Sequence, residues 1–295
     1  MGPAFGVRAR RGGREGSQAS PASRPASLSR PSPESTPAGG VGAPGGDRGA
    51  PGDRDEVRPA YYAARSGAWR DWWTLLHPPY TAWHLAYVVI GASLAPHVQL
   101  SRMLATLLAF FLAVGIAAHA LDEWYGRPLG TQIPSGVLIG VSVVALLGAI
   151  VLGAIGVVRV GWVLVPFIVI GPLLVVAYNA EWLGGLVHTD SGFALAWGAF
   201  PVLTAYVAQA ERLSLAAVIG AAGAFGLSTA QRALSTPARF VRRRVTEVHG
   251  TVVLGDGSTR DVDREMLIQP VERALRVLSW TVVLLAAAMA VSRLR

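Results

Sequence analysis

The stretch His119-Ala-Leu-Asp-Glu-Trp-Tyr-Gly-Arg-Pro-Leu-Gly-Thr131 ends a long apolar run with a group of charged side chains. His119, Asp122 and Glu123 are spaced i, i+3 and i+4, so a helix that continues out of the run would carry all three on one face. Ionisable groups that enter a membrane-length helix are costly, which favours a ligand or ion site in a polar cavity. The alternative is that the helix reaches water here and that Glu123 and Arg127 form an ordinary surface pair.

The composition indicates a helical membrane protein. Of the 295 residues, 52% are hydrophobic and only 15% are charged, and the apolar excess lies downstream of residue 67. Several apolar runs there have about 18 to 24 residues, which at 1.5 Å per residue cross about 30 Å of hydrocarbon. We therefore expect an all-α polytopic membrane protein with about seven transmembrane helices. The expected spans are near residues 80–98, 101–121, 135–157, 161–178, 192–209, 213–231 and 277–292.

The absence of cysteine and lysine excludes several kinds of chemistry. The chain has no cysteine, which excludes disulfides, thiolate metal sites and a cysteine nucleophile. All of its long basic side chains are arginine, so a lysine Schiff base is excluded as well. The formal net charge of +8 is explained more simply by arginines on the cytoplasmic side of a membrane than by nucleic acid, and we expect no nucleic-acid partner.

Residues 1–67 are rich in Gly, Pro, Ser, Ala and Arg and show no apolar period. Such a segment cannot bury enough surface to offset its ordering entropy, so we expect a disordered tail. It lacks the apolar core of a cleaved signal peptide, and its arginines favour the cytoplasmic side. The alternative is that translation starts further downstream.

A second polar island, Tyr178-Asn-Ala-Glu-Trp-Leu-Gly-Gly-Leu-Val-His-Thr-Asp190, separates two of the expected spans. Its acids and histidine can belong to the same site as His119 and Asp122, or the segment can be an ordinary loop at the membrane interface. With the arginine-rich tail inside, seven crossings place residues 122–133, 179–191 and 232–276 on the cytoplasmic face. We therefore expect a multi-pass protein of the plasma membrane with its N-terminus and both polar islands in the cytoplasm.

The remaining chain divides into a transmembrane core over residues 68–235, an insertion over 236–276 and a last helix within 277–295. In the insertion, Gly255-Asp-Gly257 is a tight-turn signal between two segments of alternating character, 245–254 and 258–262. This pattern predicts a small cytoplasmic β-hairpin. Residues 263–276 are expected to form an amphipathic helix that leads to a short last span.

The order of these elements resembles the UbiA superfamily of intramembrane prenyltransferases. In that family a motif rich in aspartate follows the second helix and another follows the sixth, and together they hold Mg²⁺ against a polyprenyl diphosphate. The resemblance covers about residues 75–235. Asp122 and Glu123 fall at the first two positions of the first motif, whereas Gly126 and Gly130 stand at its next two aspartates. The second motif should lie near 228–237, where the chain has no acid.

The resemblance implies a UbiA-like bundle and a set of site residues. Asp122, Glu123 and Arg127 are the implied catalytic residues, and Asp122 and Glu123 the implied Mg²⁺ ligands. The implied contacts to a polyprenyl diphosphate or another isoprenoid lipid are His119, Tyr178, Asn179, Glu181, His188, Asp190 and Arg232. Arg127, Arg232 and Arg239 are suited to neutralise a diphosphate, because guanidinium matches phosphate oxygens through paired hydrogen bonds.

Two functions stay open on this basis. One is transfer of a prenyl group from a polyprenyl diphosphate to an acceptor, assisted by Mg²⁺. The other is a UbiA-derived membrane protein that binds a lipid or a partner without prenyl transfer, which the missing second acidic motif favours. A transporter is a weaker third option, since the sequence shows no inverted repeat.

Overall fold

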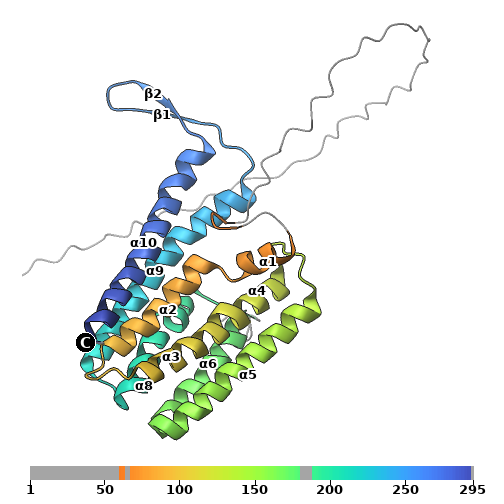
Figure 1. Cartoon of the computed structure of the whole chain (residues 1–295). Helices are drawn as coiled ribbons and strands as arrows, with labels where there is room; N and C mark the ends of the chain where they lie inside the picture. Colours follow the sequence, from red (N-terminus) through yellow and green to blue (C-terminus); the bar gives the residue numbers. More distant parts are fainter. Residues whose placement is uncertain (1–59, 64–66, 180–187, 294–295) are drawn as a thin grey trace, which may run out of the picture. The chain divides into compact units, whose positions relative to one another are not determined.

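The computed structural model describes residues 60–63, 67–179 and 188–293. The predicted disordered tail lies almost wholly outside these residues, and Glu181 lies outside them too. Within the described part, long helices run side by side, as Figure 1 shows. The structure thus confirms a predominantly helical chain.

The helices follow the apolar runs of the sequence. A short helix α1 (Ala68–Leu75) precedes α2 (Pro78–Ser93), and a continuous helix over Leu100–Gly126 consists of α3 (Leu100–Phe110), a π-helical segment (Phe111–Ala118) and α4 (His119–Gly126). Then come α5 (Ser135–Val160), a 3-10 turn (Trp162–Leu164), α6 (Val165–Asn179), α7 (Asp190–Ala194), a second π-helical segment (Leu195–Ala199), α8 (Phe200–Ala210), α9 (Leu215–Arg244) and α10 (Arg264–Arg293).

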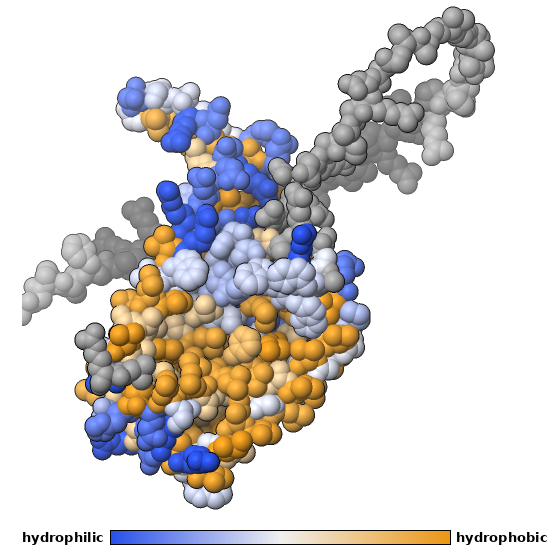
Figure 2. All heavy atoms as spheres, in the orientation of Figure 1, coloured by the Kyte–Doolittle hydropathy of each residue, from blue (hydrophilic) through white to orange (hydrophobic). Residues whose placement is uncertain are grey.

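Five helices of the described chain have the length and hydropathy needed to cross a membrane. They are Leu100–Gly126, Ser135–Val160, Trp162–Asn179, Asp190–Ala210 and Arg264–Arg293. Apolar side chains cover most of the bundle face seen in Figure 2, and polar ones gather at its two ends. Helix α2 is outside this group because it has 16 residues, and α9 because the polar residues of its second half lower its hydropathy. Several helices can therefore span a membrane, whereas the number seven stays a prediction.

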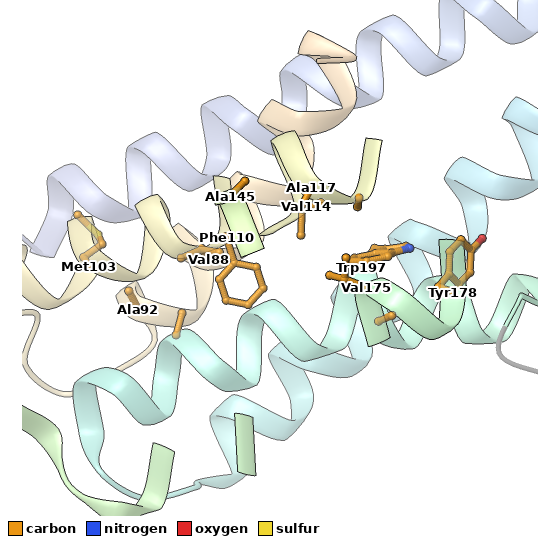
Figure 3. Close-up of a cluster of buried hydrophobic side chains, with 13 residues drawn as sticks. Val88, Ala92, Met103, Phe110, Val114, Ala117, Ala145, Val175, Tyr178 and Trp197 are labelled. Carbon is orange, nitrogen blue, oxygen red and sulfur yellow. The ribbon is translucent and has the colours of Figure 1, made fainter. Parts of the chain in front are cut away.

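The buried core joins α2, α3, the two π-helical segments, α5 and α6. Figure 3 shows this cluster, which extends from Met103 to Tyr178 and includes Trp197. Small residues let the helices approach closely: a Cβ atom at Gly198 would lie 2.5 Å from Ser228 Oγ and 2.7 Å from the carbonyl oxygen of Ala224 on α9. Such contacts are typical of membrane helix packing, where close backbone approach replaces hydrophobic driving force.

One expected helix boundary is wrong. Helix α9 continues from the sixth expected span through residue 244. Helix α10 runs from Arg264 through the predicted amphipathic helix and the last span. The extension is stabilised where the two helices pack on each other. Arg242 Nε donates a 2.8 Å hydrogen bond to Glu272, and an apolar cluster that includes Val241 and Leu275 lies beside this pair. Partners outside the apolar run thus prolong both helices.

The predicted hairpin is confirmed. Strands β1 (Thr251–Val253) and β2 (Thr259–Asp261) are antiparallel, with Val252 opposite Arg260. Gly257 adopts a φ of 81°, a value that glycine accepts without strain, so the predicted turn forms where expected. All strand residues are exposed.

Candidate functional site

A polar cavity of about 350 Å³ lies where α2, α4, α6, α9 and α10 meet. This volume is within the usual range of small-molecule sites. Residues of both polar islands line it, although the two islands are more than fifty positions apart in the sequence. The site is therefore built by helix packing and not by one motif.

The charged residues of 119–127, which end the second expected span, have two different surroundings. His119 and Asp122 line the cavity, whereas Glu123 and Arg127 are outside its lining. Consecutive residues of a helix are about 100° apart around its axis, so Asp122 and Glu123 fall on opposite sides of His119. The three side chains therefore share one broad face of α4, but Asp122 turns toward the cavity and Glu123 toward the loop that follows the helix.

Glu123 and Arg127 hold the loop that follows α4. Glu123 is fully buried, and its carboxylate accepts hydrogen bonds from Leu129 N (2.9 Å), Thr131 N (2.8 Å) and Thr131 Oγ1 (2.9 Å). The Arg127 guanidinium donates to the carbonyl oxygens of Thr131 (3.2 Å) and Ile133 (2.7 Å). These bonds engage the carboxylate of Glu123 and the guanidinium of Arg127 without a ligand. This geometry gives no support to their predicted catalytic and metal-binding roles.

Most described residues of the second island reach the cavity. Tyr178, Asn179 and His188 line it, and the rings of Tyr178 and His188 stack with centroids 4.5 Å apart. Asp190 lies outside the lining and accepts a 2.8 Å hydrogen bond from Arg232, which does line it. Three of the four described residues predicted in this island therefore belong to the cavity.

Helix α9 contributes a stripe of polar side chains where the family resemblance placed the second motif. The cavity is lined by Gln231, Arg232, Ser235, Arg239, Arg242 and Arg243 of this helix. Their spacing follows the helical period, so they form one face. Of the four arginines, Arg242 is held by Glu272 and Arg232 by Asp190. Arg232 and Arg239 were predicted to meet a diphosphate, and the other polar residues of this face are added by the structure.

An aromatic and histidine group lies against α4 at the cavity wall. The Tyr62 hydroxyl is hydrogen-bonded to His77 Nδ1, and the rings of His77 and His119 lie 4.5 Å apart. Burial holds the pKa of His77 well below its usual range, and the neighbouring His119, Arg243 and Arg239 lower it further. His77 is therefore a neutral hydrogen-bonding group at pH 7. Sequence analysis missed this group, although His77 directly precedes two prolines that start α2.

A second cavity, an apolar groove of about 400 Å³, adjoins the polar one. It is lined by α3, α5, α6, α8 and the two π-helical segments, almost entirely with apolar side chains. Val114 and Trp197 line both spaces, and each lies on a π-helical segment. In Figure 3, Trp197 lies between Phe110 and Tyr178 of the same apolar cluster. Segments of π-helix occur preferentially at functional sites, so this junction is a notable feature.

The carboxylates of the described residues do not fit a protein-held Mg²⁺ site. No group of three or more His, Asp or Glu side chains within that part of the chain is arranged to hold a metal. Asp122 and Glu272 are the carboxylates that line the cavity, and Glu272 is paired with Arg242. A metal that bridges a diphosphate needs several hard oxygen ligands. We therefore derive no chemical step through Mg²⁺.

Comparison of the chain with models of protein families, with curated proteins and with solved structures found no match. The resemblance to the UbiA superfamily therefore stays a prediction that rests on the order of motifs. The two adjacent cavities are the features of the structure that bear on function.

Proposed function

We propose that this protein is a UbiA-like integral membrane protein that binds an isoprenoid diphosphate, with the anionic head in the polar cavity and the hydrocarbon tail in the apolar groove. The observation that carries the proposal is the shared lining of the two spaces by Val114 and Trp197. A ligand with a charged head joined to an apolar tail matches this arrangement, because each part meets groups of its own polarity.

The charge of the polar cavity favours an anion. Among the described residues, four arginines line it together with the carboxylates of Asp122 and Glu272, and Asp190 pairs with one of the arginines from outside. Guanidinium groups that line a cavity attract phosphate oxygens more strongly than they would in bulk water.

The groove supplies affinity for the tail. In a bilayer the tail is already surrounded by hydrocarbon, so the groove contributes through close packing contacts and not through transfer of the tail out of water. The groove extends along the helix from Val114 to Arg102, where a 2.9 Å ion pair with Glu211 marks the end away from the polar cavity. The lipid would thus lie along the helices of the bundle.

The proposed topology has seven crossings, with α2 and α9 added to the five helices of membrane length. The arginine cluster at the end of α9 then lies in the cytoplasm, as the distribution of positive charge in membrane proteins requires. The polar cavity opens on the same side, which is where a water-soluble leaving group or acceptor of a plasma-membrane enzyme would be exchanged.

Binding of matched ligands to the purified full-length protein tests this proposal. Geranylgeranyl diphosphate carries both parts of the proposed ligand, whereas geranylgeraniol lacks the anionic head and inorganic diphosphate lacks the tail. We expect the complete amphiphile to bind at least about tenfold more tightly than either part, since head and tail contribute separately. Equal affinity for geranylgeraniol and its diphosphate would contradict the proposal.

Prenyl transfer is the second candidate function, and the aromatic rings at the junction favour it. Tyr178, Phe193 and Trp197 surround the place where the first carbon of the tail would meet the head, with Tyr178 and Trp197 centroids 5.6 Å apart. Aromatic faces stabilise a developing allylic cation. The bond from that carbon to diphosphate would break, the electron pair would leave with diphosphate, and an acceptor nucleophile would form the new bond to carbon.

The acceptor's proton would pass to His119. The Nδ1–H of His119 donates to the Gly115 carbonyl (3.1 Å), which leaves Nε2 as the proton acceptor. Release of diphosphate from bound donor, measured with and without Mg²⁺ and compared with Asp122→Asn, tests this candidate. Tight binding with no release from any donor would leave lipid binding as the function.

A further inference from the structure

We infer that the arginine face of α9 holds the phosphate head directly, so that binding does not require Mg²⁺. The inference rests on the proposed function and specifies how its ligand is recognised. Near residues 228–237, where the family resemblance places a second metal-binding motif, the cavity is lined by Gln231, Arg232 and Ser235, and Arg239 follows one turn after Ser235. Acidic ligands are thus replaced by groups that can donate hydrogen bonds.

Arg239 is the central group of this face. Among the described residues, no carboxylate lies within ion-pair distance of it, and its guanidinium makes long contacts to Ser235 Oγ (3.4 Å) and Thr236 Oγ1 (3.3 Å). A guanidinium in this state retains donors for a phosphate, with which it can form two parallel hydrogen bonds. Arg232 lies two turns earlier on the same face and is already oriented by Asp190.

Gln231 provides an independent sign of a missing ligand. Its side chain is only 3% exposed, it lines the cavity, and its Oε1 has no hydrogen-bond partner within the part of the chain that the structure describes. A buried amide oxygen without a partner is costly, and native proteins rarely leave one. A hydrated or protonated phosphate head in the cavity would supply the missing donor.

The carboxylates point to the same conclusion. A metal-bridged diphosphate needs acids that face the ligand, yet Glu272 is engaged by Arg242 and Glu123 by the loop after α4. Asp122 is left as the cavity carboxylate without an arginine partner among the described residues. One carboxylate beside several guanidinium groups favours direct recognition of the anion over recognition through a divalent cation.

The decisive experiment measures binding of geranylgeranyl diphosphate to the full-length protein in EDTA and in millimolar Mg²⁺. We expect the dissociation constants in the two conditions to agree within about threefold, because arginine contacts need no metal. Binding in Mg²⁺ alone would overturn the inference and leave the proposed function standing. Absence of binding in both conditions would overturn the proposed function together with the inference.

Substitutions on α9 locate the contact. Loss of one charged hydrogen-bonding partner weakens binding by about tenfold to a hundredfold, so we expect this effect for Arg239→Gln and Arg232→Gln. Arg239→Lys should recover part of the affinity, since it keeps the charge but not the paired donors. Arg244→Gln is the matched control, because Arg244 is exposed on the same helix and outside the cavity lining.

Thermal unfolding of each variant separates lost folding from lost binding. The inference predicts that Arg239→Gln unfolds near the wild-type temperature while its affinity falls. If Arg239→Gln is stable and binds like wild type in EDTA, the arginine face does not hold the head. If Arg244→Gln weakens binding as much as Arg239→Gln, the effect is one of general surface charge and the inference also fails.

Discussion

Replacement of Glu123 by alanine tests whether Glu123 stabilises the loop after α4, while its neighbours His119 and Asp122 face the ligand cavity. The change removes the acceptor for the backbone N–H groups of Leu129 and Thr131, two residues that are each 8% exposed. A buried donor without a partner costs about 1–3 kcal/mol, so two of them cost about 2–6 kcal/mol. That is a large part of the 5–15 kcal/mol that is typical of folded proteins.

The assay is thermal unfolding of the detergent-purified full-length protein, followed by tryptophan fluorescence. For a chain of this size about 2–4 °C is lost per kcal/mol, so Glu123→Ala should lower Tm by roughly 4–24 °C. Glu123→Gln should lie between alanine and wild type, because the amide keeps one acceptor oxygen for Thr131. The neighbouring Asp122→Asn serves as control, since its side chain faces the cavity and supports no loop.

The two variants should also differ in binding. Asp122→Asn removes a negative charge that repels a diphosphate, so metal-free recognition predicts an affinity for geranylgeranyl diphosphate that is unchanged or higher. A metal ligand at this position would instead make the affinity fall. The division of the stretch would be refuted if Glu123→Ala unfolded at the wild-type temperature, or if Asp122→Asn destabilised the fold as much as Glu123→Ala.

Three further predictions follow from other parts of the structure. Gly198→Ala should destabilise the fold by about 1–3 kcal/mol, because its methyl group would meet the backbone of α9. Gly226 has open space around it, so Gly226→Ala should be neutral or slightly stabilising in the same unfolding assay. Burial lowers the pKa of His77, so below about pH 6.5 the unfolded chain binds more protons than the folded one and the free energy of unfolding falls. Chemical denaturation between pH 7 and pH 5 should show a smaller loss of stability for His77→Asn than for wild type. Ala109→Phe should occupy part of the apolar groove and weaken geranylgeranyl diphosphate more than inorganic diphosphate, while Leu108→Phe, on the exposed face, should change neither affinity.

The apolar runs predicted the helices well because bilayer length and apolar composition are local properties. The run that ends at His119 and the run that begins at Ser135 both became helices of membrane length. The extension of α9 was not predictable in this way. It depends on Glu272, thirty residues further along the chain, which pairs with Arg242 and so stabilises helix beyond the apolar segment.

The cavity was predicted in part for a similar reason. Helical spacing identified His119 and Asp122 as neighbours, and the second island was correctly placed beside them. Tyr62 and His77 were missed because their position depends on how the chain before α2 folds back against α4, which no local pattern encodes. Gln231 lies in the segment 228–237 where an acidic motif was expected, and no sequence pattern indicates that its side-chain oxygen is buried without a partner among the described residues.

The direction in which the charged stretch faces depends on the π-helical segment before it. A π-turn adds residues relative to an α-helix, and each added residue rotates everything that follows by about 100° around the axis. The segment Phe111–Ala118 joins α3 to α4, so the faces of α3 and α4 are offset from those of one regular α-helix. The same segment carries Val114, which lines both spaces. The irregular turn thus forms part of the groove wall and also contributes to the direction in which His119 and Asp122 face the polar cavity.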